Sequence, residues 1–202
     1  MTTPRDLLIT TLEVASARPP GAGDLSLALA GAELIDLVEA GAATLEDDRI
    51  VPGESHTISD PLLNEAASGL VRQAPYETVE DWLWRRGRGL AAGYLAALTA
   101  EEQITRQHRS RRLPLGGGRS VLADTPARSA ALERWTADEP VLGWLGSAVG
   151  LREQWGEDPP EVAGEAVATV LAAVDNALRD LEAERQRRSI EEAAFDNVWR
   201  GY

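Results

Sequence analysis

Six arginines in the middle of the chain are the residues whose type and spacing could form a binding site. They form two groups, one within a predicted helix and one in the arginine-rich stretch that follows: Arg85, Arg86 and Arg88, then Arg109, Arg111 and Arg112. A guanidinium group donates paired hydrogen bonds to phosphate or carboxylate oxygens, so converging arginines form an anion pocket. We therefore predict an anion-binding site here. The alternative is a solvated face whose arginines pair with acidic residues of the same chain.

Patterns for catalysis or metal binding are missing from the sequence. A hydrolase needs a nucleophile beside a base, but the chain has no G-x-S-x-G run and only two histidines, His56 in a predicted loop and His108 among arginines. No H-E-x-x-H, EF-hand or P-loop pattern occurs, and the chain has no cysteine. We predict no catalytic residue, no metal site and no cofactor. An enzyme that uses an acidic pair, such as Asp47 and Asp48, is the alternative.

The C-terminus carries a second candidate contact surface. Phe195, Val198, Trp199 and Tyr202 are spaced i, i+3, i+4, i+7, so they share one face of a helix. Three of them are aromatic, in a chain that is only 5% aromatic. We predict that Phe195, Trp199 and Tyr202 contact a partner. They belong to a predicted C-terminal amphipathic tail (189–202) that follows a single domain (1–188). The alternative is that this face packs on its own bundle.

The elements that would position these residues are mostly helices. Residues 24–40 predict a central helix that is apolar on nearly all sides, with Asp24 as its N-cap. Helical spacing predicts further helices at 5–17 (or a strand-like entry), 61–72, 78–102, 126–136, 139–151 and 160–188. Two β-hairpins are predicted at 43–51 and 104–122. The predicted fold class is therefore mainly α, a helical bundle around a central apolar helix with two small β-hairpins.

Two short runs near the central helix resemble the Golgi phosphoprotein 3 family. They are LALAGAELIDL at 27–37 and SDPLLNEA at 59–66, similar to an ALAGA-ELA-type run followed by a (T)GDPLLDEAL-type element. The resemblance covers residues 5 to about 180. It implies a helical domain that binds the headgroup of phosphatidylinositol 4-phosphate and acts as an adaptor that retains glycosyltransferases in the Golgi. Bacterial relatives also exist.

The resemblance also implies where a headgroup pocket would lie. In the family, a tryptophan before the central helix, an arginine within it and arginines on a later helix form the pocket. In our register these positions fall at Gly21, Ala30, Trp84 and Gly87, so half of the family pocket is missing, and a shift of one residue would restore basic residues on the later helix. We expect a remodelled anionic site. The hairpin over 106–121 corresponds to a family segment used for membrane contact and self-association.

The charge distribution favours a local anionic partner. The chain carries a net charge of −13, but residues 82–122 hold eight arginines and two acidic residues, so this segment is at +6 and the rest at −19. A protein this acidic is unsuited to nucleic acid, whereas a basic patch suits a phosphorylated headgroup, an anionic membrane surface or an acidic partner. All 20 basic residues are arginine, which suggests a GC-rich bacterial genome. We expect no signal peptide, no membrane span and a cytoplasmic location, peripheral at the membrane.

Together these observations predict a non-enzymatic peripheral adaptor or regulator that recognises anionic headgroups through its basic patch. It would form a homo-oligomer through the 106–121 hairpin or the C-terminal tail. The alternative is a purely protein-binding oligomeric domain with no lipid role.

Overall fold

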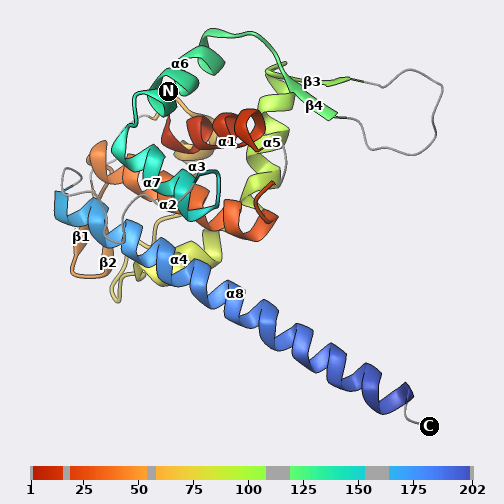
Figure 1. Cartoon of the computed structure of the whole chain (residues 1–202). Helices are drawn as coiled ribbons and strands as arrows, with labels where there is room; N and C mark the ends of the chain where they lie inside the picture. The colour runs from red at the N-terminus through yellow and green to blue at the C-terminus, as the bar shows by residue number, and fades with distance from the viewer. Residues whose placement is uncertain (1, 16–18, 54–57, 108–118, 153–163, 201–202) are drawn as a thin grey trace.

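Helix α2 (Ala22–Glu39) is the centre of the bundle, and helices α1, α4, α5 and α8 lie against it (Figure 1). The computed structural model describes residues 2–15, 19–53, 58–107, 119–152 and 164–200, with the side chains of 105–107, 119–121 and 193–200 left out. Twelve of the 18 residues of α2 are buried. The predicted central apolar helix is therefore confirmed.

The other elements follow the predicted order closely. Within the described residues the chain forms eight helices and two antiparallel hairpins, so the mainly α fold class is confirmed. Besides α2, the elements are α1 (Thr3–Val14), β1 (Ala43–Glu46), β2 (Arg49–Pro52), α3 (Pro61–Ser68), α4 (Val79–Arg86), α5 (Leu90–Ala100), β3 (Ile104–Gln107), β4 (Arg119–Leu122), α6 (Pro126–Thr136), α7 (Pro140–Ala148) and α8 (Gly164–Arg200). β1 pairs with β2, and β3 pairs with β4.

The start of α2 differs from the prediction. Gly21 is the N-cap, and Asp24 lies in the first turn of the helix. The Asp24 carboxylate instead accepts two hydrogen bonds from Arg185 of α8, at 2.8 and 2.9 Å. An acidic residue in the first turn still interacts favourably with the helix dipole, so Asp24 stabilises α2 although it is not the N-cap.

The long helix predicted over 78–102 is two helices. Thr78 caps α4, since its hydroxyl oxygen accepts from the Asp81 amide at 3.0 Å. The helix then stops at Arg86, and α5 begins after Gly89, which has a left-handed φ of 71°. Such a φ strains any residue with a Cβ, so the prediction of a continuous helix was wrong because the glycine sets a break.

Helix α8 packs across α2 and then leaves the bundle (Figure 1). At the crossing, a Cβ on Gly31 would lie 2.4 Å from Val174 Cγ2, so the close approach requires glycine. The helix continues through position 188 to Arg200 without interruption. The division between a domain ending at 188 and a tail from 189 stays a prediction, and the backbone of that tail continues α8.

Candidate functional site

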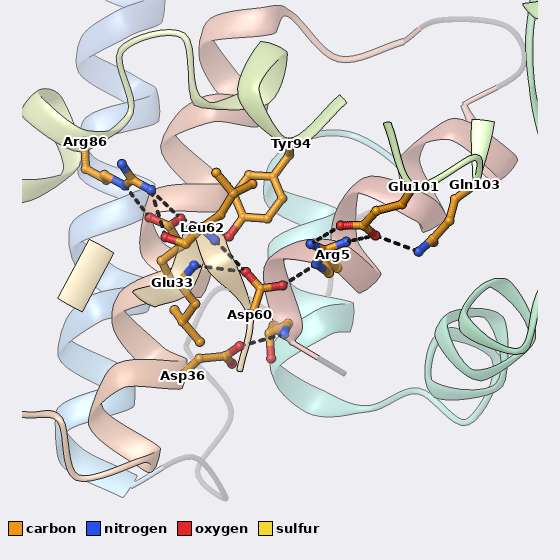
Figure 2. A network of polar contacts seen from close by, with 11 residues as sticks. Arg5, Glu33, Asp36, Asp60, Leu62, Arg86, Tyr94, Glu101 and Gln103 are labelled. Atoms are coloured by element: carbon orange, nitrogen blue, oxygen red, sulfur yellow. Dashed lines mark hydrogen bonds and ion pairs between the residues drawn. The ribbon is translucent and has the colours of Figure 1, made fainter. Parts of the chain in front are cut away.

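The two sequence runs at 27–37 and 59–66 meet at one side chain, Arg86 of α4 (Figure 2). Its guanidinium donates to both carboxylate oxygens of Glu33 in the first run, at 2.7 and 3.0 Å. It also donates to Glu65 at 2.7 Å and to the Leu62 carbonyl at 3.2 Å in the second run. Arg86 therefore joins α2, α3 and α4 into one unit.

Glu33 lies fully inside the protein, with none of its side chain exposed. Burial raises the pKa of Glu33 above its usual range, and hydrogen bonds from Arg86 and Tyr94 act against that rise. The Tyr94 hydroxyl donates to the Glu33 carboxylate at 2.9 Å, and burial also raises the pKa of Tyr94. Since Arg86 neutralises a buried carboxylate and is only 13% exposed, it has a structural task in this fold.

A second cluster surrounds Asp60, the aspartate of the SDPLLNEA run (Figure 2). Asp60 caps α3, accepting from the Leu62 and Leu63 amides at 3.0 Å each. Its other carboxylate oxygen pairs with Arg5 of α1, and Arg5 donates to both oxygens of Glu101 at 2.7 and 2.8 Å. The aspartate thus ties α1, α3 and the end of α5 together.

Arg85 is also occupied within the protein. Its guanidinium donates two hydrogen bonds of 2.6 Å to Glu77 and one of 3.2 Å to the Gly69 carbonyl. The guanidinium carbon lies 5.1 Å from the centre of the Trp82 ring, within range of a cation–π contact. With 45% of its side chain exposed, Arg85 is a solvated arginine held against its own fold.

Arg88 differs from its two neighbours. It is exposed, and among the residues that the structure describes it has no hydrogen-bond or ion-pair partner. It lines a pocket of about 300 Å³ whose other walls come from the first two turns of α2, the α4–α5 break and Leu181 of α8. The pocket is lined by Ala22, Gly23, Ser26, Leu27, Trp84, Gly87, Arg88, Gly89, Ala91, Ala92 and Leu181. Arg88 is the one charged residue among them.

The break between α4 and α5 places Arg88 at this pocket. The buried Ser26 holds the two walls together, because its hydroxyl accepts from the Ala91 amide at 3.1 Å and donates to the Ala22 carbonyl at 2.7 Å. The N-cap of α2, Gly21, has no side chain to bind the first amides of the helix. A helix N-terminus without a side-chain cap and a nearby guanidinium both favour an anion, and Arg185 holds the Asp24 carboxylate of the first turn.

Of the four positions that the family resemblance implies for a headgroup pocket, the structure places only some at this pocket. Trp84 and Gly87 line the pocket, and Gly21, the N-cap of α2, directly precedes the lining residue Ala22. Ala30 is fully buried, and its carbonyl accepts from the Trp82 indole at 3.1 Å. A shift of one residue from Gly87 reaches Arg88, the side chain that does line the pocket.

Several predicted site residues lie outside the described residues. This applies to Arg109, Arg111 and Arg112, to Tyr202, and to His56 and His108. Phe195 and Trp199 lie on the helical backbone of α8, but their side chains are outside the described part. Reasoning from sequence missed the contributions of Ser26 and Leu181, which no motif signals.

The described part of the chain contains no cluster of three or more His, Cys, Asp or Glu residues suited to a metal ion. None of the helices in the described ranges has the length and apolarity that a membrane crossing requires.

Comparison with known proteins identifies the family. Residues 4–198 match the family described as Golgi phosphoprotein 3 (GPP34), which is nearly the whole chain and extends beyond the predicted limit near residue 180. No individually curated protein matches the chain. The family consists of non-enzymatic adaptors and peripheral membrane proteins and is known for binding phosphatidylinositol 4-phosphate at the Golgi. The chain therefore belongs to the Golgi phosphoprotein 3 family.

Proposed function

We propose that this protein is a peripheral membrane adaptor that recognises an anionic lipid headgroup at the pocket between α2, the α4–α5 break and α8. The observation that carries the proposal is Arg88, an exposed arginine at the pocket without a partner among the described residues. Its guanidinium fork and the start of α2 would bind a phosphate group from two sides. The arginine-only basic composition supports a place among bacterial members, and we propose a cytoplasmic location, peripheral at the membrane.

This proposal relies on fewer arginines than the six that the sequence predicted for the anion site. Arg85 and Arg86 contribute positive charge, but acidic residues already hold their guanidinium groups. Arg109, Arg111 and Arg112 would add to the site if the segment that carries them reaches the same membrane surface. Arg88 is therefore the residue whose change tests binding most directly.

Vesicle flotation with the full chain tests the proposal. We expect the wild-type protein to float with vesicles containing phosphatidylinositol 4-phosphate and Arg88→Glu to lose most of this binding, about tenfold for each 1.4 kcal/mol of lost interaction. Arg72→Glu is the matched control, because Arg72 is exposed on the loop after α3 and lies outside the pocket residues. Equal flotation of the wild type and Arg88→Glu would refute the assignment.

A second candidate function is a purely protein-binding oligomeric domain. The half of α8 outside the bundle favours it, because this helix presents exposed surface that lipid recognition does not use. Absence of wild-type binding to every anionic vesicle, with retained self-association, would support this candidate.

A further inference from the structure

Beyond Arg185, α8 has no partner within the described residues of the bundle. Figure 1 shows it extending away from the other helices. Every residue from Gln186 to Glu192 is exposed, including Ile190 at 69%. Helices in proteins owe most of their stability to packing of one face, so a helix that projects alone is expected to gain from a partner.

The sequence of α8 continues one seam beyond the bundle. The face of α8 that packs on the bundle has residues spaced alternately by four and three, at Val167, Leu171, Val174, Leu178 and Leu181. The same spacing continues at Arg185, Arg188, Glu192, Phe195 and Trp199. Alternating spacing of this kind is the seam of a coiled coil. The seam is apolar within the bundle, charged just outside it and aromatic at the end.

We propose that the part of α8 beyond Arg185 pairs with the same segment of a second copy of this chain. The two helices run antiparallel about a two-fold axis at the level of residue 190. Seam residues equally distant from that level then face each other. Arg188 faces Glu192 of the second copy, and the symmetry repeats this pair. Leu181 and Arg185 stay on α2, where Arg185 donates to Asp24, so the paired part of the seam is centred on Arg188 and Glu192.

Charge complementarity selects this arrangement. Residues 185–188 contain three arginines, and residues 191–192 are both glutamate. An antiparallel pair sets the positive stretch of one copy against the negative stretch of the other, whereas a parallel pair would set like charges together. Glu191 and Glu192 have no ion-pair partner among the described residues. The contact is self-complementary, so it closes as a dimer.

Arg187 and Arg188 make a matched pair for testing the seam. Each donates to Glu184 at 3.0 Å, and their side chains are 70% and 72% exposed. They differ in that Arg188 lies on the seam and Arg187 does not. Reversing either charge costs the same local contact, so a difference in self-association reports on the seam.

Light scattering coupled to size-exclusion chromatography, over roughly 1–300 µM of full chain, measures the association. We expect a wild-type dimer whose dissociation constant rises about tenfold or more in Arg188→Glu and in Glu192→Arg, because each change sets like charges in both seam pairs. Arg187→Glu should change it by less than about threefold. An equimolar mixture of Arg188→Glu and Glu192→Arg should form a heterodimer, since their charges are complementary.

Disulfide cross-linking tests the register separately, because the chain contains no cysteine. Under mild oxidation, a mixture of Arg188→Cys and Glu192→Cys should cross-link faster than either protein alone. Circular dichroism verifies that each variant keeps its helix content, and Arg188→Gln replaces Arg188→Glu if helix is lost. A monomeric wild type at every concentration overturns the proposal. So does a dimer that responds equally to changes at 187 and 188, which would place the contact elsewhere.

Discussion

At the scale of single residues, the ion pair between Glu33 and Arg86 joins α2 to α4, and Arg86 also binds Glu65 and the Leu62 carbonyl of α3. The sequence predicts Arg86 in an anion site, yet Val79 and Leu83, seven and three positions earlier on α4, are buried, so Arg86 shares their inward face. A guanidinium on an apolar face needs a buried carboxylate. Glu33 of α2 supplies it and is itself fully buried.

We expect Arg86→Met to lower the free energy of unfolding by about 3–5 kcal/mol, because it leaves Glu33 charged and buried without its partner. Urea denaturation measures the change. The double variant Arg86→Met/Glu33→Leu should recover much of the loss, since an apolar pair of similar size has no charge to desolvate. Arg179→Met, which breaks an exposed pair with Asp175, should barely move the midpoint. A similar loss in both single variants would contradict the argument.

Asp36 gives a prediction of pH dependence. Its carboxylate accepts a hydrogen bond of 2.8 Å from the backbone amide of Thr3, the first residue of α1 (Figure 2). Burial raises its pKa to about 6 from an ordinary value of 3.8, against the opposing hydrogen bond from Thr3. The folded protein therefore binds this proton more tightly than the unfolded chain, so the contribution of Asp36 to stability falls as pH rises from about 4 to 6.

Asp36→Asn removes this charge and keeps an acceptor for the Thr3 amide. We expect the variant to be more stable than the wild type at pH 7 by about 1–3 kcal/mol, with the difference vanishing near pH 4. Thermal unfolding monitored by circular dichroism at both pH values checks this. A stability difference that is equal at the two values would show that the ionisation of Asp36 is not its cause.

At the scale of elements, the break between α4 and α5 determines the pocket. In a continuous helix, Arg88 would lie in a different place and the segment from Gly87 to Ala92 would not form a wall of the pocket. Gly89 permits the break through its positive φ, and Ser26 of α2 then bonds the Ala91 amide of α5.

Two glycines in this region should respond to alanine in opposite directions. Gly89→Ala should destabilise the fold by about 1–2 kcal/mol, because a Cβ is strained at a φ of 71° even with open space around it. Gly93→Ala lies inside α5, also with open space, and should stabilise by about 0.5–1 kcal/mol. Chemical denaturation of both variants tests this, and equal effects would mean that the backbone break does not depend on Gly89.

At the scale of the whole molecule, the charge of −13 restricts how a membrane role could work. An acidic body is repelled by an anionic surface over the Debye length, which is about 10 Å at 0.1 M salt. Binding must therefore come from a local site rather than from bulk attraction.

Headgroup chemistry should consequently outweigh surface charge. At equal surface charge, we expect vesicles with phosphatidylinositol 4-phosphate to bind the protein several-fold better than vesicles with phosphatidylserine, because a phosphate monoester fits a guanidinium and a helix N-terminus together. Flotation with charge-matched vesicles measures the ratio, and Arg88→Glu should bring it close to one. Binding that follows surface charge alone would contradict a specific site.

The sequence by itself determined the class of elements and much of their order. Apolar spacing on α2 predicted a central helix, helical spacing predicted that α3 begins at Pro61, and two short runs indicated the family. These signals are local, because spacing and capping depend on residues within a few positions of one another.

The tertiary structure decided which arginine serves which role. Arg85, Arg86 and Arg88 look alike in sequence, but Glu77 and Glu33 occupy the first two, and Glu33 lies 53 positions from Arg86 along the chain. Likewise, the pocket joins α2, the α4–α5 break and Leu181 of α8. Contacts between distant segments follow from how the helices pack, and no single stretch of sequence records that packing.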